Sequence, residues 1–421
     1  MAGRRGRGKA GGRPLERLTE TNTATDAAVA AVFREEAGRL TAALVRTLGD
    51  FDLAEEVVQD SLVAALETWP EQGIPDKPGA WLMTTARRRA IDILRRDKRY
   101  RDKLALLERS DLRLEPAEAD DRLRLIFTCC HPALSQEAQV ALTLRAVVGF
   151  TTIEIASAFL LSEATVAQRI VRAKRKIVDA HIPYRVPEEA ELAGRLDGVL
   201  SVLYLMFNEG YLSRGEKVAM RRDLADDAVW LASLVARLMP DQAELLGLLA
   251  LMKLNLARSA ARFDAAGDMV LLPDQDRGLW DQAGIADGIA LLDRAGAMRA
   301  TGPYQVQAAI AALHSEAQSW AETDWHQIVV LYDALVRMAD SPVVRLNRAV
   351  ALSHFAGPAA ALGEVNDLAI SLSGYHLFHS TRAELLEQLG ERAHAREELR
   401  RALELCSNPA ERSLLERRLR D

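Results

Sequence analysis

The sequence predicts an all-α protein built from several helical domains, and three observations support this fold class. Apolar residues recur every three or four positions, the spacing of amphipathic helices, along most of the chain. The strict apolar–polar alternation that is typical of half-buried strands is almost absent. At 421 residues the chain exceeds the size of one ordinary core, so two or three domains are expected.

The composition is that of a soluble globular protein, with 49% apolar and 27% charged residues. No run of about 18 apolar residues occurs, so we expect no membrane span. The basic N-terminus lacks the apolar segment of a signal peptide. Three cysteines (Cys129, Cys130 and Cys406) cannot build a disulfide framework. We therefore expect a protein of the reducing cytoplasm.

The first quarter of the chain predicts a short tail and then a helical domain. Residues 1–25 are rich in Gly, Arg and Thr, and we expect a disordered basic tail there. Helical spacing then predicts three helices, at residues 26–49, at residues 52–69 with Pro70 as the stop, and at residues 80–104 after a Gly- and Pro-containing loop. We assign residues 26–101 to this first domain.

Two of these helices carry opposite charge. Residues 50–60 hold five acids and no base, and the helical spacing i, i+3, i+4, i+7, i+8 places one polar set on a single face: Asp52, Glu55, Glu56, Gln59 and Asp60. Residues 87–103 hold nine Lys and Arg against three Asp. We expect the acidic face to be exposed and to suit a basic protein partner, and the basic helix to suit nucleic acid. A merely solvated charge run is the alternative for each.

A polar connector, residues 102–120, leads to a second helical domain at residues 121–181. Within it, residues 151–160 predict a short helix with Ile153, Ile155, Ala156 and Phe159 inward, and Leu160 to Ser162 predict a tight turn. Ser162 is a suitable N-cap for the next helix. That helix turns Val166, Ile170, Ala173 and Ile177 inward and carries an outward polar set, with Thr165 and Lys174 at its edges: Thr165, Gln168, Arg169, Arg172, Lys174, Arg175 and Lys176.

Two short helices joined by a three-residue turn predict a helix-turn-helix, whose second helix suits the major groove of DNA. Arg and Gln side chains can read base edges there, while Lys and Arg also neutralise phosphates. A solvated basic helix on an ordinary bundle is the alternative interpretation.

Residues 188–421 predict a third, larger helical domain that follows a linker near residues 182–191. Gly357 and Gly390 lie 33 residues apart within similar helical hairpins, close to the roughly 34-residue period of tetratricopeptide (TPR) repeats. Residues 1–187 hold 30 Lys and Arg against 26 Asp and Glu, whereas residues 188–421 hold 24 against 34. The two parts of the chain should therefore have different partners.

The motifs resemble a known family. "DLAEEVVQDSLVAALETW" followed by "AWLMTTARRRAIDILRR" is similar to region 2 of bacterial extracytoplasmic-function (ECF) sigma factors, and "LSEATVAQRIVRAKRKI" is similar to the end of their region 4. The long tail, with "FNEGY" at residues 207–211, resembles a subgroup that carries a TPR-like C-terminal extension. The resemblance implies a sigma region 2 domain, a region 4 helix-turn-helix domain and a TPR-like domain at the boundaries given above.

The resemblance also implies partners. The acidic face would dock on RNA polymerase core enzyme, mainly on the β′ subunit and with contacts to β. The region 2 basic helix would contact the -10 promoter element through five arginines: Arg87, Arg88, Arg89, Arg95 and Arg96. The region 4 helix would read the -35 element, and the loop at residues 70–79 would hold a flipped base.

Other classes remain as alternatives. A one-component regulator with a TPR-like sensor would use the same helix-turn-helix, but it has no need of the acidic face. An enzyme is disfavoured because no catalytic motif is found. Cys129, Cys130 and His131 lack a second ligand pair, so we expect no metal or other cofactor, and we take the cysteines as a buried pair or a redox sensor. The tail either assists or inhibits, and the short junction favours assistance.

Overall fold

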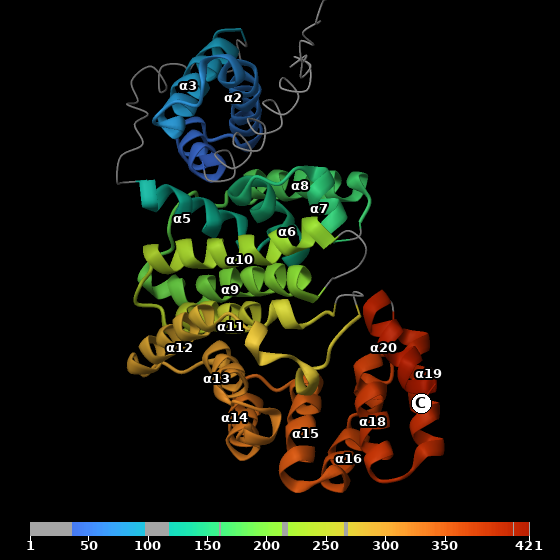
Figure 1. Cartoon of the computed structure of the whole chain (residues 1–421). Coiled ribbons are helices and arrows are strands. Elements are labelled where there is room, and N and C mark those ends of the chain that lie inside the picture. The colour runs from blue at the N-terminus through green and yellow to red at the C-terminus, as the bar shows by residue number, and fades with distance from the viewer. Residues whose placement is uncertain are drawn as a thin grey trace, which may run out of the picture. The chain divides into compact units, whose positions relative to one another are not determined.

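The computed structural model describes six stretches of the chain (Figure 1), which are residues 36–96, 118–159, 161–212, 218–264, 268–406 and 408–420. The predicted basic tail and nearly all of the predicted connector lie outside them. Across the described residues the regular structure is helical, and the extended chain pairs in one isolated bridge between Phe263 and Met269. The all-α prediction is confirmed.

The chain divides into two compact units, residues 1–202 and residues 203–421. The division falls inside helix α9 (Glu189–Leu212). The first unit opens with three helices, which lie at residues 36–48, Phe51–Gln72 (α2) and Pro78–Arg96 (α3). Their facing sides share one core, in which Leu44, Val57 and Leu82 are fully buried.

The second helix runs further than the sequence predicts. Pro70 was expected to stop it, but α2 continues to Gln72 with Pro70 in its last turn. Pro70 lacks the N–H that would donate to the carbonyl of Leu66, and its ring crowds that carbonyl, which weakens the helix there without ending it. Gly73 ends the helix instead, with φ of 81°, and its N–H donates to the carbonyl of Trp69 at 2.9 Å.

The rest of the first unit is a second group of helices, which are Glu118–Cys129 (α5), Gln136–Thr143 (α6), the π-helical turn Leu144–Val148 (η2), Thr152–Ala158 (α7) and Glu163–Asp179 (α8). Phe127, Leu125 and Leu142 are fully buried in this group. Ile155 and Ala156 on α7 are buried as predicted, whereas Ile153 is 62% exposed, so its predicted inward position is wrong.

The chain between α8 and α9 is packed rather than loose. Tyr184 donates its hydroxyl to the carbonyl of Ala42 at 2.9 Å and to that of Asp121 at 3.1 Å. On α9, Arg195 donates to the carbonyl of Phe127 at 2.6 Å. The start of α9 therefore belongs to the first unit, and residues 182–191 do not act as a free linker.

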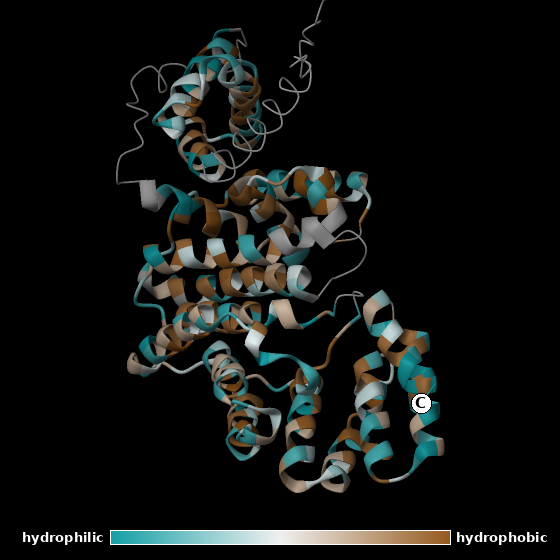
Figure 2. Cartoon of the chain, in the orientation of Figure 1, coloured by the Kyte–Doolittle hydropathy of each residue, from teal (hydrophilic) through white to brown (hydrophobic). Residues whose placement is uncertain are grey.

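The second unit is a succession of helices in chain order. The longer ones are Val218–Leu238 (α10), Ala243–Ala257 (α11), Gln282–Ala297 (α12), Pro303–Glu316 (α13), Trp325–Met338 (α14), Pro342–Ala356 (α15), Pro358–Asp367 (α16), His376–Gln388 (α18), Arg392–Leu405 (α19) and Pro409–Arg420 (α20). The shorter ones are Ser259–Ala261 (η3), Leu272–Asp274 (η4), Arg277–Leu279 (η5), Trp320–Glu322 (η6) and Ala369–Leu372 (α17). Hydrophobic residues gather where neighbouring helices face each other (Figure 2).

The last hairpins of this unit repeat each other at a spacing of 34 residues. Arg348 on α15 pairs with Glu364 on α16 at 2.6 Å, and Arg382 on α18 pairs with Glu398 on α19 at 2.6 Å. The turn of the first hairpin is made by Gly357 (φ 93°), and Gly390 (φ 84°) serves the second. This period equals that of TPR repeats, although the TPR-like assignment stays a prediction.

Helix α20 packs back on the unit that it ends. Arg418 pairs with Glu384 and Glu387 of α18 at 2.7 and 2.8 Å. Arg417 and Ser413 reach Asp268, in the segment that follows α11 and η3, at 2.5 and 3.0 Å. The last helix therefore contacts both its neighbour and a much earlier part of the unit.

Candidate nucleic-acid interface and acidic face

The helix-turn-helix forms at the predicted place. Ser162 caps α8, and its hydroxyl accepts from the backbone N–H of Thr165 at 3.1 Å. The predicted inward set is buried, which comprises Val166, Ile170, Ala173 and Ile177. Burial of this stripe turns the opposite side of α8 to solvent.

Most of the predicted DNA-facing side chains lie on that exposed side of α8. Five are exposed, namely Thr165, Gln168, Arg172, Arg175 and Lys176. Arg169 is half-buried. Four of these six side chains are cationic, and the segment is long enough to lie in a major groove. The surface therefore has the shape and charge that a recognition helix needs.

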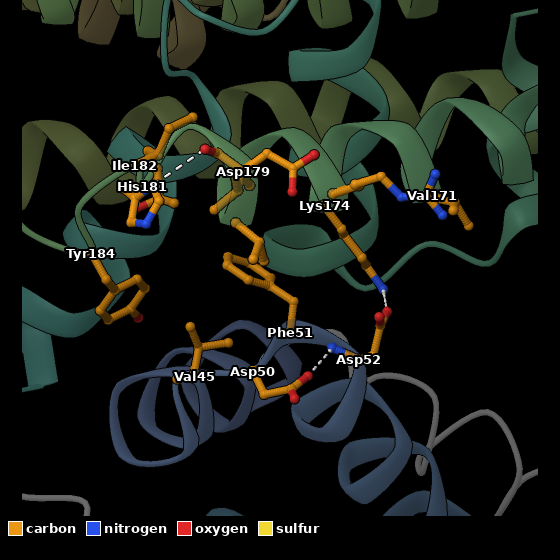
Figure 3. Close-up of a pocket in the computed structure, with 15 residues that line it drawn as sticks. Val45, Asp50, Phe51, Asp52, Val171, Lys174, Asp179, His181, Ile182 and Tyr184 are labelled. Atoms are coloured by element: carbon orange, nitrogen blue, oxygen red, sulfur yellow. Dashed lines mark hydrogen bonds and ion pairs between the residues drawn. The ribbon is translucent and has the colours of Figure 1, made fainter.

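Lys174 differs from its neighbours on α8. Its side chain is only 11% exposed, and its Nζ donates to Asp52 Oδ1 at 2.8 Å (Figure 3). The same Nζ donates to Glu55 Oε2 at 2.6 Å. Both carboxylates belong to the predicted acidic face of α2. In this arrangement the Lys174 ammonium is turned towards α2 and not towards the exposed side of α8.

Arg145 completes this group, and the sequence analysis did not identify it. Its Nε donates to Glu55 Oε1 at 2.6 Å, and its Nη1 donates to the carbonyl of Phe150 at 3.1 Å. It lies in the π-helical turn η2, where the extra backbone residue per turn shifts the direction of the side chain. We call Asp52, Glu55, Arg145 and Lys174 the ion-pair cluster. The sequence signal for Arg145 was that it is the single cation within the mostly apolar run 138–148.

The rest of the acidic face is open to solvent. Glu56 and Gln59 are exposed, Asp60 is half-buried, and the side chain of Asp52 is 81% exposed despite its ion pair. Glu55 is the exception, because its side chain is only 20% exposed between Arg145 and Lys174. The expectation of exposure is therefore wrong at Glu55 and only partly met at Asp60.

The basic helix of the first domain is α3. Arg88, Arg89 and Arg95 are exposed, and Arg87 is half-buried. The side chain of Arg96 lies outside the described part of the chain, as do residues 97–104 of the predicted helix. On the other side of α3, Leu82 and Met83 are buried in the core. Because one side of α3 is packed in the core, the described arginines project from a helix that is fixed in place.

An open pocket of about 670 Å³ lies beside the ion-pair cluster (Figure 3). The start of α2 lines one side through Phe51 and Asp52, and the end of α8 lines another through Lys174 and Val178. Val178 is 70% exposed, so part of the pocket rim is an apolar side chain in contact with solvent.

The adjacent cysteines are buried. The thiol of Cys130 lies 3.6 Å from the hydroxyl of Thr143, and burial raises the pKa of Cys130 to about 12. Burial also raises the pKa of Cys129, with the neighbouring Cys130 adding to the shift. Nδ1 of His131 accepts from the backbone N–H of Ala133. Protonated, buried thiols react slowly, which favours the packing role over a redox sensor.

Three parts of the chain match models of known protein families. Residues 32–100 match the model of sigma-70 region 2, and residues 124–177 match that of sigma-70 region 4. Residues 195–296 match a family of unknown function, DUF6596. These matches, with the helix-turn-helix and the exposed basic helices, define the class as that of sigma-70 factors.

Comparison with individual proteins defines the family. The ECF RNA polymerase sigma factor SigL of Mycobacterium tuberculosis is 30% identical over 167 residues, which is 39% of this chain and 94% of SigL. The chain belongs to the ECF sigma factors of RNA polymerase. An uncharacterized protein of Rhizobium meliloti is 45% identical over 387 residues, 90% of this chain and 92% of that protein. No solved structure matches significantly.

The chain is thus a sigma factor that directs polymerase to promoters, with an added helical C-terminal region. No helix among the described residues has both the length and the apolar character needed to cross a bilayer.

Proposed function

We propose that three surfaces divide the work of promoter recognition. The acidic face of α2 docks on core polymerase, chiefly on the β′ subunit with further contacts to β. The α3 arginines contact the -10 element, namely Arg87, Arg88, Arg89, Arg95 and, beyond the described side chains, Arg96. The exposed side of α8 reads the -35 element. The protein acts in the cytoplasm, where these partners are found.

The observation that carries this proposal is the capped helix-turn-helix with its exposed basic side. Promoter recognition by α8 requires base-edge contacts, and Arg and Gln are the residues that make them in the major groove. The test is transcription in vitro with purified core polymerase and a genomic promoter library. We expect a small set of promoters with shared -35 and -10 sequences. Transcripts without any shared upstream sequence would contradict the proposal.

The acidic face has its own test. The double variant Glu56→Lys with Gln59→Lys reverses one charge and adds another on two exposed side chains, and it leaves the ion-pair cluster intact. We expect weaker pull-down of core polymerase by a folded protein, because like charges would then face the basic partner. Glu67→Lys, an exposed acid further along α2, is the matched control. Pull-down at wild-type strength by the double variant would refute the docking role.

The C-terminal domain is proposed to be a TPR-like regulatory part. The 34-residue spacing of its last hairpins supports this, since stacked helix pairs of that length form extended binding surfaces. We propose a positive role, in which the tail assists promoter engagement, because helix α9 runs without a break from the first unit into the second. The alternative, a one-component operator-binding regulator, has no use for the region 2 domain.

A further inference from the structure

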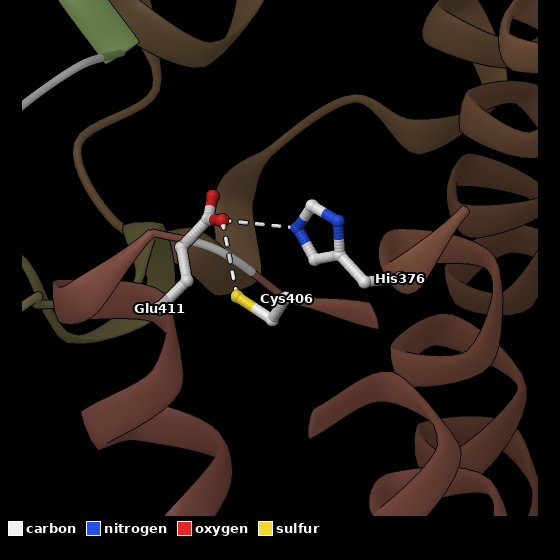
Figure 4. Close-up of side chains that lie close together, drawn as sticks. All are labelled: His376, Cys406 and Glu411. Carbon is white, nitrogen blue, oxygen red and sulfur yellow. Dashed lines mark hydrogen bonds and ion pairs between the residues drawn. The ribbon is translucent and has the colours of Figure 1, made fainter. Parts of the chain in front are cut away.

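Three side chains from three helix ends of the second unit converge at one point. His376 is the first residue of α18, Cys406 follows the last residue of α19, and Glu411 lies in the first turn of α20. Their Nε2, Sγ and carboxylate oxygen atoms all lie within 4.8 Å of one another (Figure 4). Among the described residues, it is the one group of three or more His, Cys, Asp or Glu side chains whose ligand atoms lie this close together. We propose that His376, Cys406 and Glu411 form a binding site for Zn²⁺ or a similar divalent transition metal.

The three ligand atoms lie near the spacing that a zinc ion requires. In a tetrahedral zinc site the usual metal–ligand lengths place neighbouring ligand atoms about 3.3 to 3.6 Å apart. Here Glu411 Oε2 lies 2.9 Å from His376 Nε2 and 3.8 Å from Cys406 Sγ. Shifts of about 1 Å or less, within the reach of side-chain rotation, would bring the three atoms to zinc geometry.

The chemistry of the three groups also fits. A thiolate, an imidazole and a carboxylate are the ligand types of zinc, and three protein ligands leave a fourth position for water. Cys406 is 4% exposed, while the side chains of His376 and Glu411 are 20% and 24% exposed, so the site has a buried ligand and a path for entry. Binding displaces the thiol proton of Cys406, and the thiolate and carboxylate then balance the two positive charges of the ion.

The same unit offers internal comparisons. His379 contacts Glu398 at 2.6 Å, and His394 contacts Glu391 at 2.9 Å, but no thiol joins either pair within the described residues. The neighbouring Arg412 donates through Nη1 to the carbonyls of Leu403 and Cys406.

The experiment uses the full chain and zinc alone, in competition with a chromophoric chelator. We expect one tightly bound zinc per chain, lost in Cys406→Ser and in His376→Ala and retained in the control His394→Ala. Cobalt as a spectroscopic probe should give thiolate-to-metal charge transfer in the wild type and none in Cys406→Ser. Thermal unfolding without metal checks that each variant folds. Less than one zinc per chain in the wild type, or an unchanged zinc content in both ligand variants, would overturn the site.

A second inference rests on the proposed function and on a separate observation, the ion-pair cluster. Asp52 and Glu55 belong to the proposed polymerase-docking face, and Lys174 belongs to the proposed -35 helix. The geometry points to a self-blocking contact: in the free chain α8 holds part of the docking face, and core polymerase must displace Lys174 to reach Glu55. Each ion pair has short N–O distances and at least one largely buried partner, so the contact is specific rather than diffuse.

Lys174→Met tests this inference, because it removes the ammonium and keeps the apolar stem. Arg337→Met, at an exposed position on α14 of the second unit, is the matched control for net charge. Binding to core polymerase is measured without DNA. We expect Lys174→Met to bind several-fold more tightly than the wild type and Arg337→Met to match the wild type. Equal affinity of all three would overturn the self-blocking contact, whereas failure of all three to bind core polymerase would refute the docking role itself.

Discussion

Replacement of Glu55 by Gln tests the energetic weight of the ion-pair cluster. Glu55 Oε1 accepts from Arg145 and Oε2 from Lys174, both at 2.6 Å, and the three side chains are 20%, 17% and 11% exposed. Removing the charge leaves two largely buried cations against a neutral amide. Only Asp52, which is 81% exposed, would still pair with Lys174.

The expected loss is about 2–4 kcal/mol, the range for removing one partner of a mostly desolvated, hydrogen-bonded charge pair. Glu56→Gln removes the same charge one residue along at an exposed position, so stability should hardly change. Asp52→Asn should also cost little because exposed pairs are weak.

Hydrogen exchange of the backbone amides in α2 and α8 of the full chain measures this loss without requiring two-state unfolding. A change of about 2 kcal/mol or more speeds exchange about 30-fold or more. If Glu55→Gln and Glu56→Gln exchange alike, the cluster does not stabilise the first unit and the reasoning fails.

Three further predictions follow from the interfaces and from a buried histidine. Arg169→Ala should weaken the free energy of binding to the -35 element by about 1–3 kcal/mol. An equal loss on DNA with a scrambled -35 sequence would show that Arg169 contacts only the DNA backbone. Truncation after Leu212, which spares the part of α9 packed on the first unit, should abolish transcription and leave polymerase binding intact. Higher transcription would show that the tail inhibits, and unchanged transcription would exclude both roles. Burial, aided by Arg258 and Arg277, lowers the pKa of His314 to about 4 from 6.5. Because the unfolded chain then binds the proton more readily, the second unit should lose up to about 3 kcal/mol as the pH falls from 6.5 to 4. His314→Phe should flatten this part of the pH profile of unfolding.

Local signals in the sequence predicted local structure well. The helix-turn-helix follows from a cap, a turn and an apolar stripe that lie within one short segment, and Ser162 and Ile170 occupy the expected positions. Pro70 does not stop α2, because the lost hydrogen bond and the crowding of the Leu66 carbonyl disturb the helix locally, and two more residues still follow in helical conformation.

Side chains that meet across distant segments could not be predicted in the same way. Lys174 looked like one more edge residue of a basic helix, and its burial depends on Glu55, which lies 119 residues earlier. Arg145 depends in addition on a π-helical turn that leaves no periodic signal. The convergence of His376, Cys406 and Glu411 likewise requires three helix ends to be placed in space.

The attachment of α20 to an early segment has a mechanical consequence. A stack of helical hairpins behaves as a spring when its two ends are free, and its curvature then varies with small rotations between repeats. Here Arg417 and Ser413 tie the last helix to Asp268, while Arg418 holds it to α18. These bonds join two points of the second unit that the intervening hairpins separate along the chain, so stretching or flattening the unit must first break them. A ligand or protein that meets this domain therefore encounters a surface whose last helix is tied to a much earlier segment.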